Sequence, residues 1–169
     1  MTSPTEPGTE RRLREPAERV SPRARQMWTL VALVNSLFTY GVLLAVALVW
    51  DVVPVTWWAA VLVALTFAAY TFLMPRWRYA VHRWEVTETA VYTQTGWWSI
   101  EQRIAPMSRI QTVDYQEGAI SRLFRLASVT VTTASAAGAL VIEGLDRELA
   151  RSLVQQLTRR ADAVPGDAT

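Results

Sequence analysis

Two long uncharged stretches dominate the pattern of apolar and polar positions along the chain. Met27–Trp50 and Val52–Pro75 are each 24 residues long and are separated by Asp51. A helix needs about 20 apolar residues to cross a hydrocarbon layer of roughly 30 Å, so each stretch can span a bilayer with some tilt. The pattern predicts a hairpin of two transmembrane helices over residues 27–50 and 52–75.

Two other interpretations of these stretches are weaker. An uncharged helix buried in a soluble protein would need a larger protein around it than the 169 residues of this chain provide. A cleaved signal peptide would use the small residues Ala45–Ala47, but the apolar run is longer than a signal core of about 7–15 residues, and a second run follows at once. A membrane hairpin therefore explains the pattern best.

Basic residues flank the outer ends of the two runs and are absent from the connector around Asp51. They are Arg19, Arg23 and Arg25 before the first run and Arg76, Arg78 and Arg83 after the second. Because cytoplasmic flanks of membrane helices carry an excess of basic residues, we expect both termini in the cytoplasm and the connector outside the cell membrane.

Small residues recur every four positions within each predicted span, at Gly41 and Ala45 in the first and at Ala60, Ala64 and Ala68 in the second. Small side chains let two membrane helices approach closely, so these residues are expected to pack the hairpin together. Asn35 is a strongly polar residue within the first span. It fits either a hydrogen bond between helices or at the interface, which we favour, or a proton or ion relay in a small transport protein.

The remaining segments differ in composition. Residues 1–26 are rich in Pro, Thr, Glu and Arg and are expected to be disordered, and residues 161–169 are expected to form a flexible tail. Residues 76–160 contain runs typical of strands: 79–86, 90–95, 99–105, 110–116, 128–133 and 140–144. The spacing of Ile120, Leu123 and Phe124 indicates a short helix, and the stripe of Leu149, Leu153 and Leu157 indicates a final amphipathic helix. The fold class is therefore α+β, with a β-rich cytoplasmic domain closed by one helix.

Candidates for chemistry are scarce. All 17 basic residues are Arg, there is no Cys, and His82 is the single histidine, interpreted as a structural residue of the first strand. Asp114 and Glu117 are close in sequence, but a solvated strand edge explains them more simply than paired catalytic carboxylates. No phosphate-binding glycine loop or nucleophile motif is present. The sequence indicates a protein that is not an enzyme and needs no cofactor or metal.

Several segments in order resemble the YdbS-like bacterial pleckstrin-homology (PH) domain membrane proteins. These segments are Arg19–Arg25, Ile104–Val113, Gly118–Phe124, Leu126–Val131 and Ile142–Leu145, and together they extend the resemblance over residues 19–160. The resemblance implies a PH-like β-sandwich or barrel capped by a C-terminal helix, with no established catalytic activity. Arg125 departs from the family, where Gly is usual, and predicts a different exit from the short helix.

These observations lead to a functional expectation. A hairpin and a short linker would hold a PH-like module at the inner face of the membrane, where it would present a surface to another membrane or cytoplasmic protein. That partner could be a related PH-domain membrane protein, and a homo-oligomer is also open; nucleic-acid binding is not expected. The alternative is recognition of anionic lipid headgroups in the bilayer by Arg76, Arg78 and Arg83.

Overall fold

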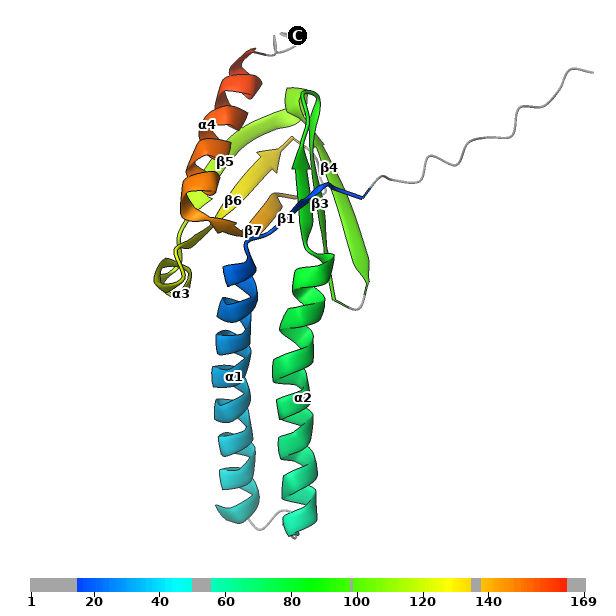
Figure 1. Cartoon of the computed structure of the whole chain (residues 1–169), viewed down its shortest axis with the longest axis vertical. Helices are drawn as coiled ribbons and strands as arrows, with labels where there is room; N and C mark the ends of the chain where they lie inside the picture. Colours follow the sequence, from blue (N-terminus) through cyan, green and yellow to red (C-terminus); the bar gives the residue numbers. More distant parts are fainter. Residues whose placement is uncertain (1–14, 50–55, 98, 135–137, 164–169) are drawn as a thin grey trace, which may run out of the picture.

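Two long helices form an antiparallel hairpin that carries a compact domain at one end (Figure 1). The computed structural model describes residues 15–49, 56–97, 99–134 and 138–163. Helix α1 (Pro22–Val49) and helix α2 (Trp57–Val81) are both long and apolar enough to cross a membrane. The connector around Asp51 lies outside the described residues. The helical hairpin expected from hydropathy is therefore present.

The domain consists of two antiparallel sheets and a covering helix. One sheet has the order β1 (Glu18–Arg19), β2 (Arg83–Val86), β3 (Ala90–Gly96) and β4 (Ile100–Pro106). After a 3₁₀ turn at Met107–Arg109, the second has the order β5 (Ile110–Gln116), β6 (Leu126–Thr133) and β7 (Leu140–Asp146), with the short helix α3 (Ala119–Leu123) between β5 and β6. Helix α4 (Arg147–Ala163) packs on the second sheet (Figure 1). This α+β arrangement confirms the expected PH-like sandwich.

The helices extend beyond the apolar runs, and this corrects three expected boundaries. The expected disorder over residues 1–26 does not hold throughout, because residues 18–19 form β1 and residues 22–26 begin α1; residues 1–14 lie outside the described part of the chain. Helix α2 continues through Arg78 to Val81, so the expected strand over residues 79–86 begins only at Arg83. Helix α4 continues to Ala163, past the expected end at residue 160. In each case tertiary packing adds turns that local composition did not indicate.

The start of α1 is built into the core of the domain. Val20, Ala24 and Trp28 are buried together with residues of both sheets and of α4. The amide of Ser21 donates to the carbonyl of Gly144 on β7 at 2.9 Å. Gly144 has φ +73°, and a Cβ added there would lie 2.7 Å from the Cβ of Ala24. Glycine at this position is therefore required both by the backbone conformation and by the close approach of α1.

A second rigid joint connects α2 to β2 through one residue, His82. The imidazole is buried; its Nδ1 lies 2.9 Å from the carbonyl oxygen of Arg78, and its ring centroid is 5.2 Å from that of Trp28. Arg78 stacks over the same indole and forms an ion pair with Glu143 on β7. Burial, together with the positive charge of Arg78, lowers the pKa of His82. His82 thus lies at the end of a helix and not on the first strand.

Arg125 takes a left-handed backbone conformation, which glycine adopts most easily. Its φ is +56°, and it is the one non-glycine residue with positive φ in the described part of the chain. Its amide donates to the carbonyl of Arg122, and its carbonyl accepts from the amide of Arg147 at the start of α4. These bonds offset a left-handed conformation that costs about 1–2 kcal/mol. The expectation of a different exit from α3 was wrong.

Replacing Gly144 with Ala should test the joint between α1 and β7. Gly144→Ala adds both the left-handed backbone penalty and a clash with Ala24, so we expect a loss of about 2–4 kcal/mol in unfolding free energy. Gly138→Ala is the matched control, because Gly138 has φ +82° with open space around its Cβ. Thermal unfolding of the detergent-solubilised chain would measure both. Equal losses for the two variants would contradict close packing at Gly144.

The pH dependence of stability should reveal the buried His82. Because its folded pKa lies below the ordinary 6.5, the unfolded chain binds more protons, and the stabilisation is complete above pH 6.5 and is lost as the pH falls toward the folded pKa. We expect the melting temperature to fall between about pH 7.5 and about pH 5.5. His82→Gln, which cannot titrate, should flatten this part of the profile. An unchanged slope in the variant would assign the effect to other groups.

Candidate membrane-interface site

The two faces of the hairpin meet through different residues from those expected on α1. Thr71 on α2 donates from its hydroxyl to Ser36 Oγ on α1 at 3.0 Å, and this bond is buried. The Tyr40 hydroxyl donates to the carbonyl of Ala60 at 3.3 Å. Ala64 and Ala68 line a 220 Å³ cavity between the helices with Ser36 and Tyr40. The expected small face of α2 is thus turned toward α1.

Gly41 and Ala45 do not lie against α2, so this part of the expected packing is wrong. A Cβ added at Gly41 would have no atom within 4 Å, and Ala45 is exposed. The residues of α1 that turn toward the partner helix follow the series Ala32, Ser36 and Tyr40. Asn35, adjacent to this series, is exposed on the outer surface of the hairpin. The hairpin in this structure therefore leaves the Asn35 side chain outside the contact between the two helices.

The three arginines expected to bind lipid do not form one site. Arg78 pairs with Glu143 and has 27% of its side chain exposed, and Arg83 pairs with Glu15 at 3.8 Å with 24% exposed. Arg78 lies on the last turn of α2 and Arg83 on β2, and each is turned toward an acidic partner. Arg76 is exposed and has no acidic partner among the ion pairs of the described residues, so it differs from Arg78 and Arg83.

Arg76 instead lines a groove together with Arg25 of α1. A groove of 420 Å³ lies between α1 and α2, and its lining includes Arg25, Gln26 and Thr29 from α1 and Arg76 from α2. Below these polar residues the groove is lined by Leu30, Leu33 and Phe72. Sequence analysis had used Arg25 only to orient the hairpin. That Arg25 and Arg76 line the same groove could not be predicted from sequence, because it depends on how the two helices are aligned along their axes.

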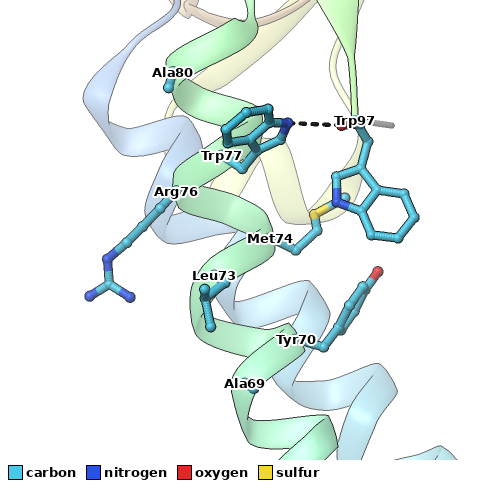
Figure 2. Close-up of a pocket in the computed structure, with 8 residues that line it drawn as sticks. All are labelled: Ala69, Tyr70, Leu73, Met74, Arg76, Trp77, Ala80 and Trp97. Atoms are coloured by element: carbon cyan, nitrogen blue, oxygen red, sulfur yellow. Dashed lines mark hydrogen bonds between the residues drawn. The ribbon is translucent and has the colours of Figure 1, made fainter. Parts of the chain in front are cut away.

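An apolar hollow lies on another side of α2, next to the turn between β3 and β4 (Figure 2). It has a volume of 640 Å³ and is lined by Tyr70, Leu73, Trp77 and Trp97, among others. The indole N–H of Trp77 donates to the carbonyl of Trp97 at 2.8 Å, and the rings of Tyr70 and Trp97 meet edge to face with centroids 6.3 Å apart. These contacts hold the β3–β4 turn beside the carboxyl-terminal part of α2.

The side of the domain that faces the hairpin exposes large apolar side chains. Trp97 and Ile100, at the β3–β4 turn, are 52% and 60% exposed, and Leu123 of α3 is 74% exposed. Helix α3 lies beside α1, where the Ser121 hydroxyl donates to Met27 Sδ at 3.5 Å, and the β3–β4 turn lies beside α2 (Figure 1). We call Trp97, Ile100, Ile120 and Leu123 the membrane-facing rim. Tryptophan is enriched where membrane proteins meet the membrane–water interface, so these residues are candidates for contact with the bilayer surface.

A groove on the domain itself runs between β1–β2 and α4. It has a volume of 440 Å³, with Val86, Leu149 and Leu153 on its apolar walls and Glu18 and Glu85 among its polar lining. Trp84 also lines it, and its buried indole N–H has no hydrogen-bond partner in the described parts of the chain. Because this nitrogen is closed to solvent, its unpaired N–H is a local cost of folding and is not a contact that the groove offers to a ligand.

The acidic residues singled out in the sequence are held in structural pairs. Glu117 accepts hydrogen bonds from Arg147 and from the Tyr115 hydroxyl; desolvation alone would raise its pKa, but these bonds outweigh it, and the pKa is lowered. Asp114 accepts from the Thr112 hydroxyl at 3.4 Å. Within the described ranges no group of three or more His, Asp or Glu residues could hold a metal ion.

Comparison with known proteins supports these structural features. The model of the Bacterial PH domain family matches residues 29–161. The chain is also 26% identical over 157 residues to the UPF0699 transmembrane protein YdbS of Bacillus subtilis (strain 168), and the match covers 90% of this chain and 98% of that protein. No solved structure matches it significantly. The family model covers more than half of the chain, and the chain has the two apolar helices, the two sheets and the closing helix described above. This chain is therefore a two-span membrane protein of the bacterial PH domain family.

Proposed function

We propose that this protein is a membrane-anchored, non-enzymatic interaction module that holds a peptide-binding groove at a fixed orientation above the inner face of the cell membrane. The observation that carries the proposal is the fusion of hairpin and domain. The first turns of α1 lie in the domain core, and one residue joins α2 to β2. A flexible tether would serve for attachment alone, whereas two rigid joints fix the direction in which the domain faces.

The arginine flanks support a cytoplasmic location for both termini and for the domain. In this orientation the membrane-facing rim reaches the inner leaflet on both sides of the hairpin. Burying one Ile or Leu side chain contributes about 1.5–3 kcal/mol. Insertion of the membrane-facing rim into the leaflet therefore adds to the effect of the two joints in fixing the orientation of the domain. Helix α4 runs along one flank of the domain, away from the hairpin (Figure 1), so the groove beside it is open to the cytoplasm in this orientation.

The lining of the groove beside α4 defines the chemistry of its partner. Leu149 and Leu153 favour apolar side chains, and Glu18, at the edge of the groove, favours a basic one. A peptide segment of another membrane or cytoplasmic protein supplies both groups. Recognition of anionic lipid by Arg76, Arg78 and Arg83 together is not favoured, because Arg78 and Arg83 are paired with acidic residues.

Site-specific photocrosslinking in native membranes should identify the partner. A benzophenone side chain at Ser152, which lines the groove, should give an adduct with another protein, whereas the same group at Gln155, exposed on α4 but outside the groove lining, should not. Leu149→Arg should abolish the Ser152 adduct because it places a charge in the apolar wall. Equal adducts from both positions, adducts only between copies of this chain, or an adduct that survives Leu149→Arg would contradict the proposal.

The position of the rim can be measured directly because the chain has no cysteine. Single variants Ile100→Cys and Leu123→Cys, labelled with an environment-sensitive fluorophore in nanodiscs, should be quenched by nitroxide groups on the lipids. Thr158→Cys, exposed on the last turns of α4, is the control and should not be quenched. Equal quenching at all three positions would show that the domain does not rest on the membrane as proposed.

A further inference from the structure

We propose that the groove formed by Arg25, Gln26, Thr29 and Arg76 binds the headgroup of one anionic phospholipid of the inner leaflet, with an acyl chain lying over Leu30, Leu33 and Phe72. The site does not depend on the protein-binding groove beside α4, which is formed by other elements.

The charge of the groove is not neutralised by the protein. Ion pairs among the described residues engage Arg23, Arg78, Arg83, Arg103 and Arg147, but neither Arg25 nor Arg76. Both are exposed, and they come from different helices. Two guanidinium groups lining one groove without a carboxylate repel each other, and an anion between them removes this repulsion. Phosphate suits this place, because the planar guanidinium group can donate two parallel N–H bonds to two phosphate oxygens.

Local hydrogen bonds restrict the residues at the polar end. Arg76 Nη1 donates to the carbonyl of Phe72 at 2.8 Å, which turns the guanidinium back along α2 and leaves its other N–H groups for a ligand. The Thr29 hydroxyl donates to the carbonyl of Arg25 at 2.8 Å and can still accept a hydrogen bond. Gln26, also on the lining, adds an amide that can bind a headgroup oxygen or hydroxyl.

The order of polar and apolar residues fits a lipid better than a free anion. From Arg25 to Leu33 is eight residues, or about 12 Å along the helix axis, and the lining changes over this distance from charged to wholly apolar. A soluble phosphate would use only the polar end. A phospholipid uses both ends, with its phosphate at the depth of the two arginines and its chain in the hydrocarbon layer. Basic pockets between membrane helices on the cytoplasmic side bind anionic lipids in this way.

The alternative is that Arg25 and Arg76 only set topology by their charge. Lysine preserves that charge but not the planar fork, so the variant Arg25→Lys with Arg76→Lys separates the two roles. Arg122→Gln is the matched control for charge, since Arg122 is an exposed arginine of α3, on the membrane side of the domain, that does not line the groove.

The test is lipid retention by the full-length chain, measured by native mass spectrometry after reconstitution with phosphatidylglycerol and phosphatidylcholine of identical acyl chains. We expect selective retention of one phosphatidylglycerol. Arg25→Gln and Arg76→Gln should each reduce it about fivefold, from about 1 kcal/mol per arginine. The double Lys variant should insert normally yet lose several-fold retention, and Arg122→Gln should retain lipid as the unaltered chain does.

Three outcomes would overturn the proposal. The first is equal retention of the two lipids. The second is an equal loss in Arg122→Gln, which would indicate a diffuse charge effect. The third is stabilisation by inorganic phosphate alone as strong as that by phosphatidylglycerol, which would make the site one for a free anion. If the Gln variants fail to insert, the double Lys variant decides the question, because unchanged retention in it would assign the arginines to topology. Failure of the crosslinking at α4 would leave this result unaffected.

Discussion

The close packing of α1 against β7 is the constraint on which the rest of the structure depends. Ala24 and Gly144 approach so closely that no side chain fits at Gly144, and Ser21 is hydrogen-bonded to the same residue of β7. Trp28, one turn further along α1, then contacts both His82 and Arg78 of the other helix. The two helix ends and the second sheet thus form a single packed unit. Because the domain has no independent linker, its height and rotation relative to the bilayer follow from the hairpin.

This arrangement assigns different tasks to arginines that look alike in sequence. Arg78 joins α2 to β7 through Glu143, and Arg83 pairs with Glu15 within the domain, while Arg25 and Arg76 are exposed and line the groove between the two helices. The structure therefore divides the arginines that flank the two helices into those held in ion pairs and those that line a groove. The acidic partner decides which task each arginine performs, since an ion pair neutralises the charge that a headgroup would otherwise attract.

The hairpin and the PH-like domain could be predicted because each depends on a long, repeated pattern. An uncharged run of 24 residues predicts a membrane helix by its length, and the alternation of apolar and polar residues in Val129–Thr132 predicts a strand. The pairing of helix faces could not be predicted, because small residues are compatible with several faces; the packing in the structure uses Ser36 and Thr71, whose hydrogen bond spans 35 residues. The ion pair of Arg78 with Glu143, 65 residues apart, was equally inaccessible. Arg125 adopts a left-handed conformation because Arg147 donates to its carbonyl, a long-range cause that local preference cannot reveal.

The bond between Ser21 and Gly144 also has a consequence for biogenesis. These residues are separated by most of the chain, so the amino-terminal segment has no partner while the hairpin is being synthesised and inserted. Strand β7 emerges from the ribosome only after both helices are complete. The contact between Ser21 and Gly144 therefore forms only after the two long helices have been made, and α4 follows to complete the core. A chain that ended before β7 would keep both helices but would lack the residue to which the start of the chain is bonded.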